Sequence, residues 1–276
     1  MRLGGPATTY DSPDAWAADL VRLGYTTSYL PGDDVPTAKS FAVAAKERGI
    51  LLAENGAWSN PIDADPAKRK AAIEKCVRLL HIADEAGAVC TVNIAGSRGP
   101  VWDGPDPQNL AEETFDLIVE SVRTIIDTAK PRRAYYTLET MPWIFPDSPD
   151  SYLGLLKAID RRQFAVHLDV VNMINCPARA YRTGDFIREC FQKLGPHIKS
   201  CHLKDVRFAS DRHLTLHLDE CRAGQGLIDF ASLFRELDRL PADTPALLEH
   251  LPSPEEYALA AEHLRGVAAN AKVSLQ

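Results

Sequence analysis

The sequence predicts an α/β fold of one kind, a single (β/α)₈ TIM barrel spanning residues 1–276. The chain has 276 residues, and a barrel of this type typically needs roughly 250. Short apolar runs alternate with longer amphipathic segments, which is typical of parallel strands joined by crossover helices. No GxGxxG or GxxxxGKS/T motif follows an early strand, which argues against a doubly wound nucleotide-binding sheet.

Eight short runs are nearly continuous in apolar residues, a pattern that favours strands buried on both faces. The first run is weak and lies at the start of the chain. In order, the runs cover residues 2–4, 27–30, 50–53, 90–94, 135–138, 164–168, 198–201 and 246–248.

Helix boundaries between these runs carry capping signals. Asp11-Ser12-Pro13 opens the first helix with a capping side chain and a proline in the first turn, and Gly24 ends it. Ser-Pro pairs at 148–149 and 253–254 open two further helices in the same way. The other predicted helical segments are 65–87, 109–130, 185–194 and 229–240.

Composition and charge narrow the function classes. Hydrophobic residues make up 45% of the chain and charged residues 25%, which are ordinary values for a globular protein. No run is long and apolar enough to span a bilayer, so we expect no membrane association. The net charge of −7 argues against a nucleic-acid partner, because phosphate binding usually needs a basic face.

The six cysteines show no CxxC motif and no pairing pattern. A chain of this size needs no disulfides, and no apolar leader follows Met1, so we expect reduced thiols and a cytoplasmic location. Barrels of this kind commonly self-associate, which makes a homo-oligomer an expectation that the sequence does not test.

Four side chains that bind metals well stand at the ends of the last four predicted strands. These residues are Glu139, Asp169, His202 and Glu249, separated by 30, 33 and 47 residues. The carboxyl ends of barrel strands converge on one mouth, where active sites lie. A single acid after a strand is usually a cap or a solvated loop residue, but four in succession are much harder to explain by chance.

Three carboxylates brought together repel one another unless a cation neutralises them. We therefore predict one divalent metal held by Glu139, Asp169, His202 and Glu249. Oxygen ligands with one imidazole favour Mn²⁺, with Mg²⁺ or Co²⁺ as alternatives. Open coordination positions would let substrate oxygens bind the ion.

Other polar or aromatic residues near the strand ends are candidates for contacting a small substrate, each with a structural alternative. His167 shares the register of Asp169 and either touches substrate or fills the barrel core. Asn172 either binds substrate or caps a turn. Lys204 and Arg207 could hold a hydroxyl, a carboxylate or an oxyanion, or lie on the surface. Glu54 and Trp58 follow the third strand, where Trp58 could wall the pocket or pack. Glu220 has no assigned role, and His213 and His217 are expected as loop or strand residues rather than ligands.

Several phrases resemble the xylose isomerase-like barrel superfamily. They are Leu138-Glu139, His167-Leu168-Asp169, the segment 201–205 (CHLKD), the segment 224–230 (GQGLIDF) and Leu248-Glu249-His250. The resemblance covers nearly the whole chain and implies the same four metal ligands. It also implies that Glu139 and Glu249 move protons, as the two glutamates of ketose 3-epimerases do. Those epimerases usually carry a histidine where this chain has Asn172.

The leading hypothesis is therefore a metal-dependent isomerase or epimerase acting on a keto-sugar or sugar acid through a metal-bound enediolate. The alternative is a lyase that removes a substituent from a 3-oxo sugar, similar to superfamily members that cleave C-glycosides, or a decarboxylase of a 3-oxo sugar acid. Two further alternatives are an endonuclease IV-like phosphodiesterase and a non-catalytic barrel subunit. Asn93 and Asn172 stand where the nuclease would carry histidines.

Overall fold

The computed structural model describes residues 1–211 and 216–276. Within these ranges, eight parallel strands close into a barrel, which confirms the predicted (β/α)₈ fold. The barrel strands are β1 (Arg2–Gly4), β2 (Thr27–Tyr29), β3 (Leu51–Gly56), β4 (Cys90–Asn93), β5 (Tyr135–Glu139), β6 (Phe164–Leu168), β7 (Ile198–Leu203) and β10 (Pro245–Leu248). Their order around the barrel is β1-β10-β7-β6-β5-β4-β3-β2.

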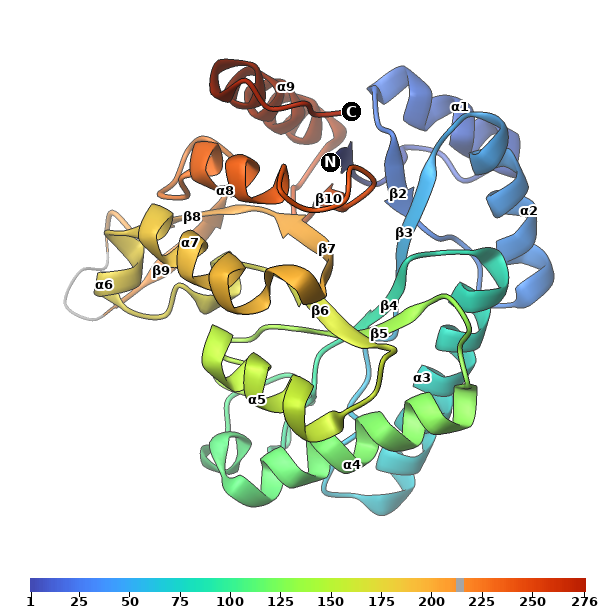
Figure 1. Ribbon diagram of the computed structural model, residues 1–276, viewed down its shortest axis with the longest axis vertical. Coiled ribbons are helices and arrows are strands. Elements are labelled where there is room, and N and C mark those ends of the chain that lie inside the picture. The colour runs from blue at the N-terminus through green and yellow to red at the C-terminus, as the bar shows by residue number, and fades with distance from the viewer. Residues whose placement is uncertain (212–215) are drawn as a thin grey trace.

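Helices surround the strands, as Figure 1 shows. The α-helices are α1 (Pro13–Leu23), α2 (Val35–Glu47), α3 (Pro66–Ala86), α4 (Glu112–Ala129), α5 (Pro149–Ile159), α6 (Pro177–Ala180), α7 (Thr183–Leu194), α8 (Phe230–Leu237) and α9 (Pro254–Ala271). Short 3₁₀ turns cover Pro107–Leu110, Val171–Met173 and Gly195–His197. No helix in the described part of the chain is both long and apolar enough to cross a membrane.

The capping signals at the first helix work as the sequence predicts. The Ser12 hydroxyl accepts a hydrogen bond from Ala15 N at 3.1 Å, and Pro13 occupies the first turn. Gly24 ends the helix at φ 71°, a left-handed conformation that costs glycine little.

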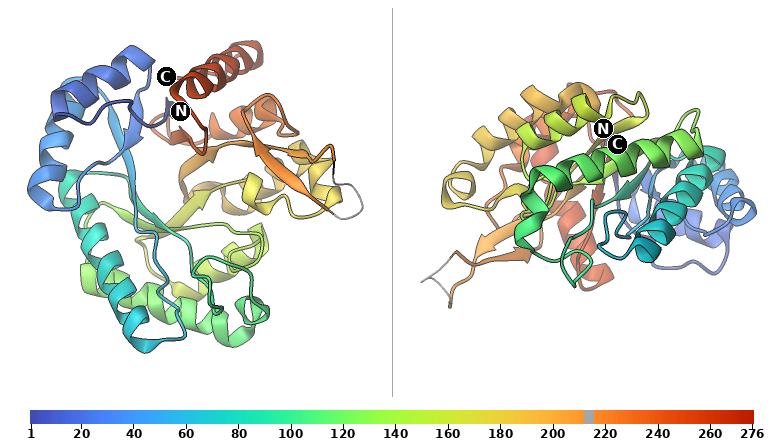
Figure 2. Two further views of the ribbon diagram at one scale, coloured as in Figure 1. Left: turned by 180° about the vertical axis from the view of Figure 1, so that it is seen from behind. Right: turned by 90° about the horizontal axis from the view of Figure 1, so that it is seen from below.

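Helix α2, the short helix α6 and one β-hairpin depart from the sequence prediction. Helix α2 was not predicted; it begins after the Asp34 cap and buries the small faces of Ala38, Ala44 and Ala45, which give a weak apolar signal. An antiparallel hairpin of β8 (Asp205–Phe208) and β9 (Leu218–Cys221) lies between β7 and α8. This hairpin projects away from the barrel in Figures 1 and 2.

The ends of the chain meet where the barrel closes. Strand β1 pairs with β10 in the register Leu3 to Ala246. Gln276 N donates to Met1 O at 3.0 Å, and Leu3 N donates to Gln276 O at 2.8 Å. Figure 1 shows the two termini side by side. The terminal residues therefore help to hold the first strand in place.

Candidate metal centre

The barrel brings Glu139, Asp169, His202 and Glu249 together at the carboxyl ends of four neighbouring strands. Glu139 ends β5, Asp169 directly follows β6, His202 lies near the end of β7 and Glu249 directly follows β10. Each residue offers one ligand atom, and these atoms all lie within 4.8 Å of one another. All four side chains are buried. The group is therefore compact enough to surround one ion.

A buried tyrosine fixes the two strands that carry the first two acids. Tyr152, on α5, accepts a hydrogen bond from Leu138 N at 3.1 Å, and its hydroxyl lies 3.0 Å from Ala165 O. The hydroxyl thus links β5 to β6 close to Glu139 and Asp169. Because the link is made inside the packed barrel wall, the strand ends have little freedom to separate.

The His202 ring is held by acids on both sides. Its Nδ1 atom lies 3.0 Å from Glu249 Oε2 and 3.3 Å from Glu139 Oε1. Its Nε2 atom lies 3.0 Å from Glu54 Oε1, and an ionised carboxylate can only accept, so Nε2 donates. This arrangement turns Nδ1 toward the cluster. Metal-binding histidines usually have a carboxylate or carbonyl on the other ring nitrogen.

Lys204 supplies a positive charge beside the acids. Its Nζ atom lies 2.9 Å from Asp169 Oδ2, 2.8 Å from Glu249 Oε1 and 3.9 Å from Glu139 Oε1. Asp169 Oδ2 and Glu249 Oε1 pair with this ammonium but make no hydrogen bond of good geometry. These two buried oxygens can also serve as ligand atoms for a cation.

The charges and donor types of the cluster fit a divalent metal. Three carboxylates and the Lys204 ammonium leave two negative charges, which one divalent cation would neutralise. Three oxygen donors with one imidazole nitrogen match the preferences of Mn²⁺, Mg²⁺ or Co²⁺. The residues Glu139, Asp169, His202 and Glu249 therefore fit the metal site that the sequence predicts.

Burial and the neighbouring charges shift the pKa values of the acids in the cluster. Burial raises the pKa of Asp169, and the neighbouring Glu139 and Glu249 add to this against the opposing effect of Lys204, so the pKa reaches about 7. Burial also acts to raise the pKa of Glu249, but His202 and Lys204 outweigh it and lower the pKa. Asp169 is thus the carboxyl group of the three whose ionisation its surroundings oppose, and a nearby cation would favour its charged form.

A cavity of about 450 Å³ opens above the cluster. Glu139 and Lys204 reach it from the floor, and Asn172 lies beside them. The Asn172 amide donates to Glu139 Oε1 at 3.0 Å, and its backbone N–H donates to Asp169 Oδ1 at 3.0 Å. Aromatic and apolar side chains supply most of the remaining wall: Trp58, Ile94, Trp102, Met141, Pro142, Trp143, Val171, Ile174, Val206 and Leu218.

The structure places the predicted substrate contacts at different depths. Trp58 and Lys204 line the cavity together with Asn172. Glu54 and His167 are fully enclosed, with Glu54 behind His202 and His167 Nδ1 3.3 Å from Glu54 Oε2. Arg207 is exposed on hairpin strand β8 and is not among the residues that line the cavity.

Another histidine singled out in the sequence falls beside that hairpin. His217 lies just before β9 and pairs with Asp219 at 3.2 Å, away from the cluster. His213 lies outside the described residues.

Several residues of the cavity wall were not predicted from the sequence. Trp102 and Trp143 lie in the loops after β4 and β5, and His250 follows Glu249. Glu220, which had no assigned role, lies with its Oε2 3.0 Å from His250 Nδ1 and its Oε1 3.3 Å from Lys204 Nζ. The signal that could have found these residues is their position in loops that follow barrel strands, because those loops form the active sites of such barrels.

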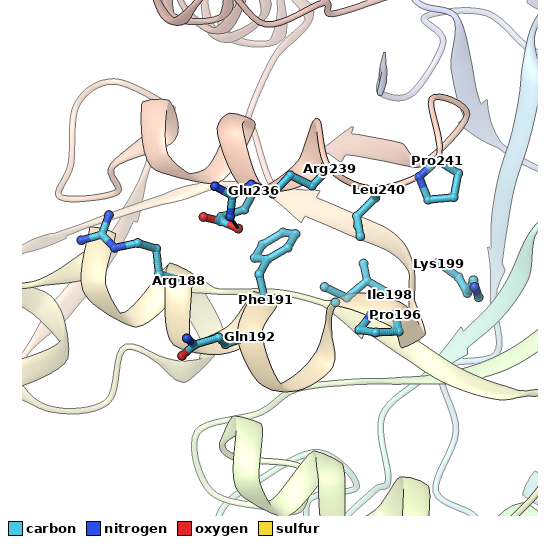
Figure 3. Close-up of a pocket in the computed structure, with 11 residues that line it drawn as sticks. Arg188, Phe191, Gln192, Pro196, Ile198, Lys199, Glu236, Arg239, Leu240 and Pro241 are labelled. Atoms are coloured by element: carbon cyan, nitrogen blue, oxygen red, sulfur yellow. Dashed lines mark hydrogen bonds and ion pairs between the residues drawn. The ribbon is translucent and has the colours of Figure 1, made fainter.

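A second cavity, of about 520 Å³, lies away from the cluster. Figure 3 shows it between the helices α7 and α8, with Phe191, Leu240 and Pro241 around it. Ile198 and Lys199, at the amino end of β7, also line it. His202 stands at the opposite end of that strand, so this cavity is separate from the metal centre.

Known structures share this fold at low sequence identity. A D-tagatose 3-epimerase-like protein matches with a TM-score of 0.74 and 18% identity over 99% of this chain and 98% of that chain. Endonuclease IV from Thermus thermophilus matches with a TM-score of 0.72 and 16% identity over 98% and 100%. A xylose isomerase-like TIM-barrel protein from Mycobacterium smegmatis, in complex with magnesium, matches with a TM-score of 0.67 and 18% identity over 97% and 94%.

No curated protein matches the sequence significantly. The structural likenesses lie at identities that establish the fold and leave the reaction open, since an epimerase-like protein and a nuclease are both among them. The sequence does match a family model described as xylose isomerase-like TIM barrel over residues 15–267, nearly its whole length. The chain therefore belongs to the xylose isomerase-like TIM-barrel family.

Proposed function

We propose that this protein is a divalent-metal-dependent enzyme that moves a proton at carbon in a keto sugar, as a sugar isomerase or epimerase does. The observation that supports this best is the convergence of Glu139, Asp169, His202 and Glu249 within 4.8 Å, next to a cavity that Glu139 lines. A bound Mn²⁺, or Mg²⁺ or Co²⁺ in its place, would act as a Lewis acid toward a substrate carbonyl oxygen.

We assign Glu139 the role of the base that removes the proton from carbon. It reaches the cavity, and the Asn172 amide holds its Oε1 atom at 3.0 Å, which orients the carboxylate. The pKa of Glu139 is lowered, because His202 outweighs the opposing effect of burial. Glu139 is therefore ionised and able to accept a proton at neutral pH. Glu249 lies across His202 and is the second carboxylate that could return one.

We assign Lys204 the role of hydrogen-bond donor to the substrate oxygen. Burial acts to lower the pKa of Lys204, but Asp169, Glu249 and Glu139 outweigh it and raise the pKa well above its usual value. The side chain is therefore an ammonium that lines the cavity floor beside Glu139. It could donate a hydrogen bond to an oxygen that gains negative charge as the carbon loses its proton.

The charge of the cavity favours a neutral keto sugar over a sugar acid. Asp103, Glu139 and Glu220 line it, while Lys204 is already surrounded by the acids of the cluster and His250 pairs with Glu220. A substrate carboxylate away from the metal would meet these negative charges. This favours isomerisation, epimerisation or elimination on a neutral sugar over decarboxylation of a sugar acid.

Elimination from a 3-oxo sugar is the second candidate, and the pair of Glu220 and His250 favours it. The hydrogen bond to Glu220 raises the pKa of His250 against the smaller effect of burial. His250 lines the cavity and its side chain is exposed, so it could protonate a departing group. In this reaction Glu139 would remove the carbon-bound proton as before, and the leaving oxygen would take a proton from His250.

The test is an NMR assay in deuterated water with the Mn²⁺-loaded protein and a panel of ketoses and 3-oxo glycosides. Isomerisation or epimerisation predicts deuterium at the carbon next to the carbonyl and a rearranged sugar. Elimination predicts a released alcohol or phenol. Glu139→Gln, compared with the wild type at equal metal content, should slow either reaction by ~10²–10⁴-fold. Wild-type turnover in Glu139→Gln at equal metal content would exclude Glu139 as the base.

The remaining alternatives have direct outcomes in companion assays. Nicking of duplex DNA that contains an abasic site would support a phosphodiesterase. Absence of bound metal after reconstitution with Mn²⁺, Mg²⁺ or Co²⁺ would support a non-catalytic barrel. Either result would replace the proposed reaction.

A further inference from the structure

Three tryptophans line the cavity above the metal centre, and the proposed proton transfer makes no use of them. The chain has four tryptophans. Trp16 is fully buried in the core, whereas Trp58, Trp102 and Trp143 are 42%, 39% and 37% exposed. All three exposed indoles border the same cavity. Clustered exposed aromatic surface usually marks a binding site.

The three indoles belong to one side of the barrel mouth. Trp58 follows β3, Trp102 follows β4 and Trp143 follows β5, and these strands are neighbours in the barrel. We call Trp58, Trp102 and Trp143 the aromatic wall. The opposite side carries Lys204 after β7 and His250 after β10. The tryptophans that line the cavity thus lie on one side of it, and its basic side chains lie on the other.

Local contacts hold part of the aromatic wall in place. The Trp143 indole N–H donates to Asp103 O at 2.9 Å. Gly56 lies so close to Trp58 that a Cβ atom there would stand 1.9 Å from the indole Nε1 atom. The absence of a side chain at Gly56 thus makes room for the Trp58 ring. Indoles held in this way are prepared to bind a flat partner.

A simple sugar can lay a C–H face on one indole, but it is too small to cover three of them. Its hydroxyls need hydrogen-bond partners, and burying them against indole carbons leaves them unpaired at a cost. The cavity, at about 450 Å³, lies within the range of ~300–1,000 Å³ that holds drug-sized ligands. There is therefore room for an apolar group beside a sugar.

We propose that the substrate is a sugar that carries an aromatic substituent, and that this substituent lies against the aromatic wall. The sugar would face Glu139, Lys204, Glu220 and His250, where hydroxyls find charged partners. This inference rests on the proposed sugar chemistry and names its substrate class. Offset or edge-on contacts between the substituent and the indoles would add to the area that it buries.

Equilibrium binding to the full-length, Mn²⁺-loaded protein tests this with a matched pair of probes. Methyl β-D-glucopyranoside and phenyl β-D-glucopyranoside differ only in the group attached to the sugar, and calorimetry measures the affinity of each. We expect the phenyl compound to bind about tenfold more tightly or better. Trp143→Ala should cut this ratio to below about threefold. Tyr181→Ala, which removes an aromatic side chain 73% exposed outside the cavity, should leave it unchanged.

Three outcomes would overturn the proposal. The first is equal affinity for the two glycosides, and the second is a ratio that Trp143→Ala does not change. The third is no binding of either glycoside up to its solubility limit. Sedimentation of both proteins adds a check: if Trp143→Ala dissociates an oligomer and leaves the ratio intact, the aromatic wall is a subunit interface.

Failure of this inference and failure of the proposed reaction are distinguishable. The binding ratio requires no turnover, so it can be high even if deuterium never enters a sugar. Conversely, exchange on simple ketoses with no preference for the phenyl probe would keep the reaction and reject the aromatic substituent.

Discussion

At the scale of single residues, Glu54 decides which nitrogen of His202 faces the metal centre. Glu54 is 1% exposed and accepts from His202 Nε2, so Nδ1 points toward Glu139 and Glu249. The two buried imidazoles, His167 and His202, outweigh the effect of burial and lower the pKa of Glu54 to about 2. Glu54 is thus charged at neutral pH, and its geometry suits a positioning residue better than a substrate contact.

Glu54→Gln should weaken metal binding by roughly 10–100-fold, because a second partner of this kind typically contributes that much. An amide can present either oxygen or nitrogen, so it holds the imidazole less firmly. Competition with a coloured chelator measures the affinity. Glu85→Gln is the matched control: Glu85 pairs with Lys39 at 2.6 Å on the outer helices and should not affect it. Unchanged affinity in Glu54→Gln would remove the positioning role.

The position of Lys204 could be predicted from the sequence, but its ion pairs could not. Its place after His202 predicted a group at the barrel mouth, and it lines the cavity there. Its ion pairs with Asp169 and Glu249 could not be predicted, because they depend on the side-chain path across the barrel. The same limit applies to Glu54, whose partner His202 is 148 residues away in sequence.

At the scale of elements, the β8–β9 hairpin is held at its base by one buried carboxylate. Asp205 Oδ2 accepts from Gly224 N at 3.0 Å and Gly226 N at 2.9 Å, and Oδ1 accepts from Val206 N and Ile228 N. A Cβ atom at Gly226 would lie 2.3 Å from Asp205 Oδ1, so glycine is required there. This anchor positions the strand that carries Glu220 over the cavity.

Asp205→Asn should reduce the free energy of unfolding by about 1–3 kcal/mol, since one acceptor oxygen becomes an amide nitrogen facing N–H donors. Urea denaturation measures the loss. Asp84→Asn is a matched variant, because Asp84 Oδ1 accepts from three backbone N–H groups, including Arg133 N at 2.6 Å and Ala134 N at 2.9 Å. Both variants should lose stability, but faster amide exchange in β9 is expected only in Asp205→Asn. Equal exchange in the two would contradict the local anchor.

The elements that the sequence did not predict share a physical cause. The small alanine side chains on the buried face of α2 give weak periodicity, and its core contacts come from packing on α1 and α3. The strands β8 and β9 have 4 residues each, which is too short for a pattern to stand out, and the hairpin projects from the barrel rather than lying in it. The barrel strands could be predicted because they are buried on both faces and therefore form nearly continuous apolar runs.

At the scale of the whole molecule, a metal at this site would tie four strands together. Glu139, Asp169, His202 and Glu249 belong to β5, β6, β7 and β10, which are consecutive in the barrel. Ligands that bind only the folded state stabilise it by mass action. Folding also assembles the four ligands, since they lie far apart in the unfolded chain.

Mn²⁺ at about 100 times its dissociation constant should add about 2.7 kcal/mol to the free energy of unfolding. For a chain of this size that corresponds to a rise in Tm of roughly 5–10 °C, reversed by a chelator. Differential scanning calorimetry measures it. Glu249→Gln should show a much smaller rise, whereas Glu256→Gln, in an ion pair with Arg222 on the outside, should respond like the wild type. An equal rise in all three proteins would place the ion elsewhere.

The sequence by itself determined the barrel and named the four candidate ligands, because strand ends in a barrel converge whatever their side chains are. The pattern of apolar runs and the spacing of Glu139, Asp169, His202 and Glu249 were enough for both predictions. Only the tertiary structure decided the partners of those ligands and the two-sided cavity above them. Ion pairs such as Glu54 with His202, and the gathering of Trp58, Trp102 and Trp143, depend on side-chain directions across closed strands, which no local sequence pattern specifies.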